Sequence, residues 1–190
     1  MRPDFYRCAA AAKELLLQQN ITSTWIDIRS LRYRKRIFFD SFENYCRMTG
    51  MDYAEVSAAL PDGCTLKKDS AYIVLYHNEE RKKDRLNFTL AHEIGHIYLK
   101  HQSDGDLEEI EANFFAAELL MPESVLRYLI RQNNGLRAED LHEWFYVTRM
   151  AAEKRLQTLK RKYDLPSPQD REILRRFLPY LSVEEPPIWA

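Results

Sequence analysis

The sequence of 190 residues contains only three cysteines, Cys8, Cys46 and Cys64, and none of them belongs to a CxxC pair. An odd number of widely separated cysteines does not suggest a disulfide framework, and a cysteine zinc site normally uses closely spaced pairs. We therefore expect reduced thiols that are mostly buried.

Long hydrophobic runs and an excess of one charge are also lacking. No apolar segment approaches the roughly 20 residues of a membrane-spanning helix, because Lys13 and Glu14 interrupt the nearest N-terminal candidate, Cys8 to Leu17. The formal net charge is -1, so no bulk imbalance indicates a nucleic acid or a membrane as partner. With 45% hydrophobic and 30% charged residues, the chain resembles ordinary globular proteins. We expect a soluble, cytoplasmic protein with no membrane partner.

The periodicity of apolar residues predicts an α+β fold with a small sheet. An apolar stripe from Phe5 to Leu16 predicts a first helix. A short buried strand is expected at 36–40, and a hairpin is expected from strands at 64–66 and 71–76. Further helices are expected at 87–100, 107–121, 123–132, 138–145, 149–163 and 169–178.

These elements suggest a core domain with a helical addition. We expect the core at 1–122, a helical subdomain at 123–163 that docks a protein substrate, and a C-terminal tail with one short helix at 164–190. Pro122 marks the first boundary, because proline cannot continue the preceding helix.

The helix expected at 87–100 carries the motif HExxH. His92 and His96 are four residues apart, so both imidazoles project from one helix face and can bind one cation. Two neutral imidazoles suit zinc, and Glu93 lies beside the metal, where its carboxylate can take a proton from a zinc-bound water. The motif predicts one zinc ion per chain and a general base, Glu93, for the hydrolysis of a peptide bond.

A catalytic zinc needs a third protein ligand, which the same run does not supply. Leu99 and Gln102 occupy the positions at which a metzincin has its further Gly and His. His101 is one residue out of register, and we expect its side chain to be exposed.

The next helix offers carboxylates instead. Glu109 and Asn113 share one face of this helix, so we expect Glu109 as the third ligand and Asn113 as the residue that orients a ligand imidazole. Glu111 and Glu108 are competing ligands, of which Glu111 is favoured. A solvated acidic first helical turn, which the helix dipole favours, explains all three acids without a metal.

Three segments together resemble the ImmA/IrrE family of metallopeptidases: NFTLAHEIGH at 87–96, EIEAN at 109–113 and FAAELLMP at 115–122. The resemblance implies a zincin-like core of the gluzincin type, with a third ligand corresponding to Glu109 and, at Asn113, a residue that supports a ligand without binding the metal. It also implies a substrate class, because known members cleave helix-turn-helix repressors. We therefore expect a zinc endopeptidase whose partner is such a repressor.

Two further features bear on substrate binding. The strand expected at 71–76 leads toward the motif helix and is a candidate edge strand for pairing with an extended substrate. A plain hairpin strand that supports the core explains the same pattern equally well. Zincins commonly stabilise the oxyanion with a Tyr or His, and the candidates are Tyr72, Tyr76, His77, Tyr98 and His142. The sequence does not choose among them.

The region 141–163 reads like a helix-turn-helix with a basic second helix, to which Arg149, Lys154 and Arg155 belong. This pattern favours an alternative class, in which the protein is a DNA-binding or adaptor regulator that retains a zinc-binding domain without proteolysis. A solvated helical subdomain that docks a protein substrate explains the same charges, and the whole-chain charge shows no basic bias.

Overall fold

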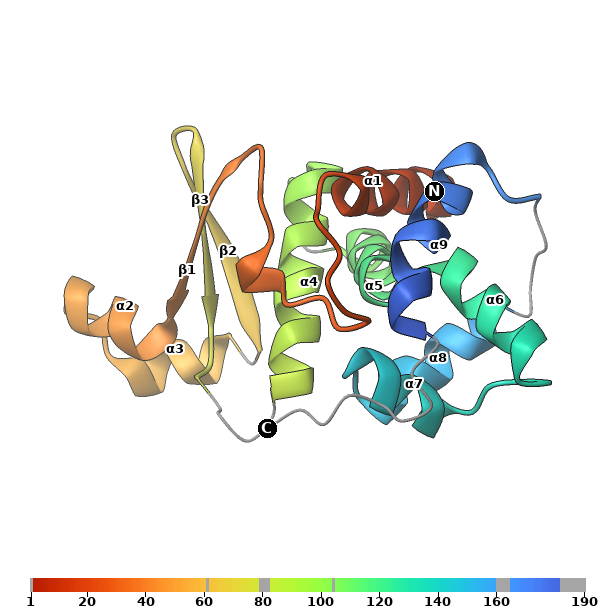
Figure 1. Ribbon diagram of the computed structural model, residues 1–190. Coiled ribbons are helices and arrows are strands. Elements are labelled where there is room, and N and C mark those ends of the chain that lie inside the picture. Colours follow the sequence, from red (N-terminus) through yellow and green to blue (C-terminus); the bar gives the residue numbers. More distant parts are fainter. Residues whose placement is uncertain (1, 61, 79–82, 104, 160–164, 182–190) are drawn as a thin grey trace.

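The chain forms layers of helix and sheet (Figure 1). The computed structural model describes residues 2–60, 62–78, 83–103, 105–159 and 165–181. The first part of the chain forms α1 (Phe5–Leu17), a 3-10 helix η1 (Ile28–Ser30), β1 (Arg36–Ser41), α2 (Phe42–Thr49), α3 (Tyr53–Ala59), β2 (Gly63–Lys68) and β3 (Ala71–Tyr76). The rest is helical, with α4 (Lys83–Leu99), α5 (Asp106–Leu120), α6 (Glu123–Gln132), α7 (Ala138–Phe145), α8 (Arg149–Leu159) and α9 (Pro168–Leu181).

The α+β class expected from the sequence is confirmed, including the helical segment that follows the sheet. Helix α4 begins at Lys83 rather than at Asn87. The helix expected at 149–163 extends to Leu159, and its remaining residues lie outside the described part of the chain, as does the tail beyond Leu181. None of the described helices is long and apolar enough to cross a membrane.

The sheet is mixed, with the strand order β1-β3-β2. Strand β3 pairs in parallel with β1 and antiparallel with β2, so Ala71–Tyr76 is the central strand. Because both edges of β3 are occupied, the prediction that it pairs with substrate as an edge strand is wrong. Strand β2 is the edge that lies beside α4.

Local signals set several element ends. The Ser41 side chain accepts a hydrogen bond from the backbone N–H of Asn44 and thereby caps α2, which ends at Gly50 with a positive φ of 74°. Asp52 caps α3 by accepting from the backbone N–H groups of Ala54 and Glu55.

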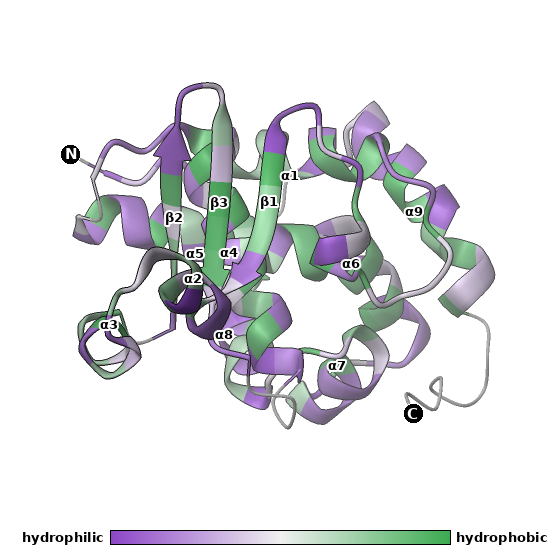
Figure 2. Ribbon diagram, turned by 90° about the vertical axis from the view of Figure 1, so that its left-hand side faces the viewer, coloured by the Kyte–Doolittle hydropathy of each residue, from purple (hydrophilic) through white to green (hydrophobic). Residues whose placement is uncertain are grey.

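Figure 2 shows the central strand β3 as the most hydrophobic strand of the sheet, with α4 and α5 behind the sheet. One hydrophobic core joins buried residues of α1, α4 and α5 to those of α6 to α9, from Cys8 to Leu181. The division at residues 122 and 163 stays a prediction.

Helices α4 and α5 approach closely at a glycine. A Cβ on Gly95 would lie 3.1 Å from both Cα and the carbonyl oxygen of Ala112, which are backbone atoms of α5. A glycine inside a helix costs about 1 kcal/mol relative to alanine. Here the glycine allows α5 to pack closely on α4, and α5 carries the acidic residues expected at the metal site.

A valine at position 95 should therefore destabilise the protein. We expect Gly95→Val to lower the free energy of unfolding by about 1–3 kcal/mol, because its side chain would collide with the backbone of Ala112. Gly95→Ala should lose less, since alanine recovers about 1 kcal/mol of helix propensity. Urea unfolding of the variants tests this, and equal stability of wild type and Gly95→Val would contradict the close approach.

A buried ion pair connects α8 to α5. The guanidinium of Arg155 contacts the carboxylate of Glu118, both side chains are 1% exposed, and Arg155 Nε donates to the backbone oxygen of Met121 at 3.0 Å. Burial raises the pKa of Glu118, although the charge of Arg155 opposes this shift. Arg155 was expected among the basic residues that could meet DNA; it is instead part of the core.

Removing Arg155 should be costly, because Glu118 would remain buried without its partner. We expect Arg155→Met to lower the free energy of unfolding by about 3–5 kcal/mol. Its neighbour Lys154 is exposed, so Lys154→Met is a matched control that should change stability by less than about 0.5 kcal/mol. Thermal or urea unfolding measures both, and similar small losses would show that the ion pair is not structural.

Candidate metal centre

Helices α4 and α5 bring two imidazoles and one carboxylate together. His92 Nε2 lies 2.9 Å from His96 Nε2, and the two oxygens of Glu109 lie 3.3 Å from His92 Nε2 and His96 Nε2 respectively. Both imidazoles are largely buried, whereas Glu109 is 43% exposed. In the described part of the chain, these three residues are the one group of His, Cys, Asp and Glu side chains with the geometry of a metal site.

These donors fit zinc. Zinc lies about 2.0–2.2 Å from histidine and carboxylate ligands, so neighbouring donors of a tetrahedral site are about 3.3 Å apart. The separations of 2.9 and 3.3 Å are close to this value. Two imidazoles and a carboxylate also leave a fourth position open, as catalytic zinc sites do.

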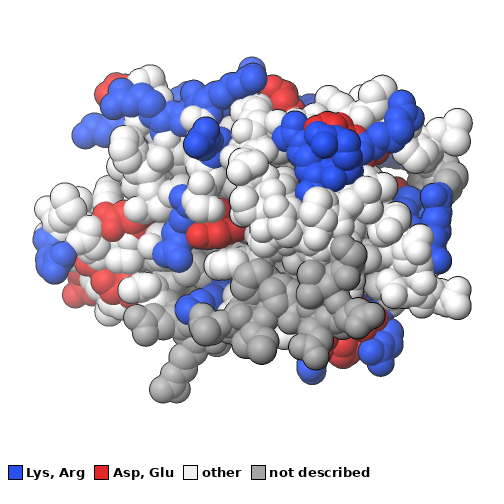
Figure 3. Space-filling model, in the orientation of Figure 1, with Lys and Arg blue, Asp and Glu red and all other residues white. Residues whose placement is uncertain are grey.

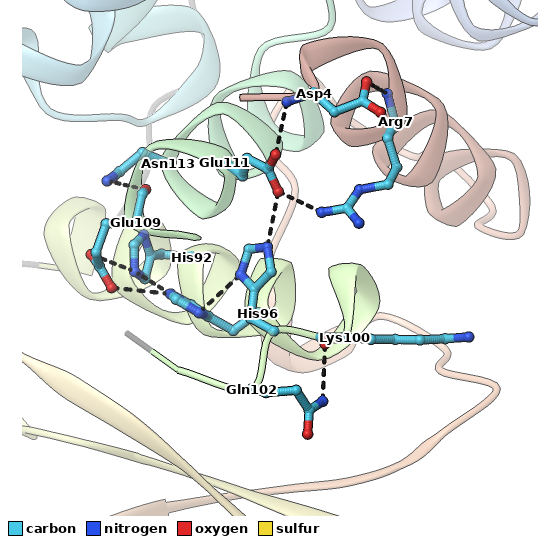
Figure 4. Close-up of polar contacts among 10 residues, drawn as sticks. Asp4, Arg7, His92, His96, Lys100, Gln102, Glu109, Glu111 and Asn113 are labelled. Atoms are coloured by element: carbon cyan, nitrogen blue, oxygen red, sulfur yellow. Dashed lines mark hydrogen bonds and ion pairs between the residues drawn. The ribbon is translucent and has the colours of Figure 1, made fainter. Parts of the chain in front are cut away.

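The competing carboxylate, Glu111, points elsewhere (Figure 4). It is 4% exposed and accepts a hydrogen bond of 2.7 Å from the backbone N–H of Asp4, and it pairs with the Arg7 guanidinium. Burial alone would raise the pKa of Glu111, but hydrogen bonds from Asp4, His101 and Arg7 outweigh it and lower the pKa. Glu111 is therefore an ionised acceptor behind the metal group.

His101 links Glu111 to a metal-group histidine. His101 Nε2 lies 3.1 Å from Glu111 Oε2, and His101 Nδ1 lies 3.2 Å from His96 Nδ1. An ionised carboxylate only accepts, so His101 Nε2–H donates to Glu111, and a ring that carries its proton at Nε2 accepts at Nδ1 from His96 Nδ1–H. This leaves the lone pair of His96 Nε2 for a metal. The expectation that His101 is exposed is wrong, because its side chain is 5% exposed.

Asn113 does not take the orienting position expected for it. Its side chain is exposed, and its Nδ2 donates to the backbone oxygen of Glu109 at 2.7 Å within the same helix. His92 Nδ1 is buried and has no hydrogen-bond partner among the described residues. In this structure the amide of Asn113 orients neither imidazole.

Glu93 is held at the sheet. Its side chain is buried, and its Oε2 accepts a hydrogen bond of 2.6 Å from the hydroxyl of Thr65 on β2. Gly63 allows this approach of strand and helix, because a Cβ there would lie 2.9 Å from Thr89 Cγ2 and 3.1 Å from the backbone oxygen of Leu75. The carboxylate next to His92 in sequence is thus fixed by strand β2.

One cleft contains the metal group, Glu93 and the edge strand β2. Of the proposed oxyanion residues, Tyr72 lines this cleft, whereas Tyr76, His77, Tyr98 and His142 do not. His77 contacts Tyr53 and Leu60, His142 donates to the backbone oxygen of Val147, and Tyr98 and Tyr76 pack on the core.

Sequence reasoning missed the supporting residues Thr65, His101 and Arg7. The spacing of His101, five residues after His96, was a usable signal, because a residue just beyond a helix end can fold back on its last turn; here its N–H bonds to the backbone oxygen of His96 at 3.1 Å. Thr65 and Arg7 carried no signal, since each reaches the site only through tertiary packing.

The fold and this site define a metallopeptidase type of protein, an α+β domain whose motif helix and following helix present two histidines and a glutamate. A family model described as the IrrE N-terminal-like domain, Peptidase_M78, matches residues 46–157. The match covers more than half of the chain, so the protein belongs to this family, and the resemblance seen in the sequence is confirmed. No curated protein and no solved structure matches the chain in similarity searches.

Metal affinity should depend on the residues behind His96. We expect Glu111→Gln and His101→Leu to weaken zinc binding about tenfold or more, because His101→Leu removes the acceptor of His96 Nδ1–H and Glu111→Gln removes the charged acceptor that orients His101. Glu108→Gln, on the same helix but outside the metal group, is the control that should bind as wild type. A competition titration with a chromophoric chelator measures the affinities, and unchanged affinity in both variants would show that the hydrogen-bond chain is not needed.

Proposed function

We propose that this protein is a zinc-dependent endopeptidase with Glu93 as its general base. The observation that carries the proposal is the placement of a buried carboxylate beside a group of two histidines and a glutamate in one cleft. Family membership supports a peptidase-type function in general.

His92, His96 and Glu109 would hold the metal. When bound, zinc supplies Lewis acidity, which activates water and polarises the peptide carbonyl. Glu93 takes the proton of the attacking water and returns it to the leaving amine, and the hydrogen bond from Thr65 keeps its carboxylate oriented for both transfers. Tyr72, in the same cleft, is the candidate to stabilise the developing negative charge.

Strand β2 is the proposed support for substrate. It has one neighbouring strand in the described sheet, and Gly63, Cys64, Thr65 and Lys67 line the cleft. An extended peptide that pairs with this edge would lie along α4, so its backbone would pass the metal group and Glu93. We therefore propose for β2 the role that the sequence suggested for β3.

The proposed substrate is a helix-turn-helix repressor, as in the family that the motifs resemble. An edge-strand mechanism requires the cut segment to be extended, so cleavage should fall in a linker or a locally unfolded segment rather than inside a folded helix. Cleavage would relieve repression.

The substitution Glu93→Gln separates metal binding from hydrolysis of the peptide bond. We expect this variant to retain about one zinc per chain and to cut no repressor, because an amide cannot accept the proton from water. Glu109→Ala should lose zinc instead. Elemental analysis measures the zinc content of each variant, and electrophoresis of a repressor from the same genome measures cleavage. Cleavage by Glu93→Gln at the wild-type rate would overturn the assignment of the base.

The alternative is a DNA-binding or adaptor regulator, which the arrangement of α7 and α8 favours. The two helices are joined by Tyr146, Val147 and Thr148 and pack on each other. Burial of Arg155 removes one of the basic side chains that this reading requires. DNA binding that falls steeply with salt and survives loss of Glu109 would support the alternative.

A further inference from the structure

The end of the cleft near the C-terminus of α4 is lined by three lysines from three different segments. Lys35 precedes β1, Lys67 lies on β2 and Lys100 follows α4 directly. We call these three residues the lysine subsite. Figure 3 shows basic side chains gathered above the strands, in the region of the view where the sheet and α4 end.

Lys35 is held in place rather than free in solvent. Its Nζ donates to the backbone oxygen of Ile97 at 2.5 Å and lies 5.5 Å from the ring centre of Tyr72 and 5.1 Å from that of Tyr98. Burial lowers the pKa of Lys35, and the charges of Lys100 and Lys67 lower it further. All three lysines line the same cleft.

Several other basic side chains that line the cleft have a carboxylate partner, unlike the lysines of the subsite. Lys13 pairs with Asp170 at 2.7 Å, Arg127 pairs with Glu123 at 2.6 Å, and Arg85 pairs with Asp62. Among the described residues, no carboxylate pairs with a lysine of the subsite, and Asp69 in the nearby hairpin turn makes no such contact either. The described residues therefore supply no carboxylate partner for the positive charge at this end of the cleft.

Strand geometry relates the lysine subsite to the proposed catalytic group. Thr65 and Lys67 are two residues apart on β2, so their side chains share the sheet face on which Thr65 reaches Glu93. The distance along the strand is about 7 Å, which is two residues of an extended chain. If a peptide pairs with β2, the peptide side chain that lies next to Lys67 would therefore be about two residues away from the bond that is cut.

We propose that the lysine subsite binds an acidic side chain of the peptide substrate, about two residues from the bond that is cut. This proposal rests on the proposed peptidase function and adds a sequence preference to it. An Asp or Glu carboxylate supplies the charge that the three lysines lack, and the ring of Tyr72 forms the floor on which Lys35 is held. A nucleic acid would satisfy the same charges, but the lysines lie in the cleft that holds the metal group and beside the edge strand, where a peptide is expected.

The test uses the zinc-loaded Glu93→Gln protein, which should bind peptides without cutting them. The probes are extended peptides of Thr and Val that carry a single Glu at successive positions, with matched peptides that carry Gln. We expect one Glu position to bind about fivefold more tightly than its Gln partner, an effect that higher salt should weaken. Fluorescence anisotropy measures these affinities.

Substitutions in the zinc-loaded protein identify the residues responsible. Lys67→Gln and Lys100→Gln should abolish the preference for Glu, whereas Lys68→Gln, whose side chain alternates to the opposite face of β2, should preserve it. The charge-reversed pair Lys67→Glu and Lys100→Glu should prefer a Lys peptide at the same position. Zinc content and circular dichroism confirm that each variant is folded.

Three results would overturn the proposal: no preference for Glu at any position, a preference that all the lysine variants retain, or tighter binding of oligothymidylate than of the Glu peptide through the same lysines. Failure of the peptidase function is seen separately. If wild type cuts no peptide or repressor while the Glu preference and its loss in Lys67→Gln are observed, the proposed catalysis fails and the lysine subsite stands.

Discussion

The close packing of α5 on α4 is the constraint on which the site depends. Gly95 lies between His92 and His96 in the helix. Because glycine has no Cβ, the backbone of Ala112 can pack so closely that a Cβ on residue 95 would lie only 3.1 Å from it. At that separation, a short carboxylate on the first turn of α5 reaches both imidazoles, as Glu109 does at 3.3 Å. A wider spacing would leave two histidines without a third ligand. Glycine is thus a structural requirement of the metal group, although it takes no part in chemistry.

A second constraint is the contact between α4 and the sheet. Gly63 lets β2 approach Thr89 closely, and this approach brings Thr65 to Glu93. The same strand is the open edge of the sheet and leads on to Lys67 at the end of the cleft. Strand β2 therefore carries Thr65, which contacts the proposed base on α4, and Lys67, which belongs to the lysine subsite, along the proposed substrate edge.

The sequence predicted what depends on local periodicity. The spacing of His92 and His96 places both on one helix face, and successive residues of a helix are about 100° apart, so Glu109 and Glu111 face directions that differ by about 200°. Only one of them can face the two histidines of α4, and the face that Glu109 shares with Asn113 favoured Glu109. Strand order was beyond reach, because β1 pairs with β3 across the intervening α2, α3 and β2. Asn113 was misjudged because a shared helix face does not fix the direction of a side chain.

Arg155 shows a signal that was present but was interpreted differently. It lies three residues after Ala152 and four before Leu159, which are both buried, and so belongs to the inner stripe of α8. A charge in such a stripe requires a buried partner, and Glu118 occupies the corresponding inner position on α5. Counting Arg155 with the exposed basic residues overstated the resemblance of α8 to a DNA-recognition helix.

The metal group also depends on a segment outside the family match. Helix α1 precedes residue 46, yet the backbone N–H of Asp4 and the guanidinium of Arg7 both contact Glu111, which holds His101 and through it His96. Burying an ionised carboxylate is favourable only with such partners, so α1 is what allows Glu111 to remain charged behind the site. The docking of α1 on α5 is consequently linked to the orientation of His96. A change that loosens the N-terminal helix would act on the metal group over two hydrogen bonds, without touching a ligand.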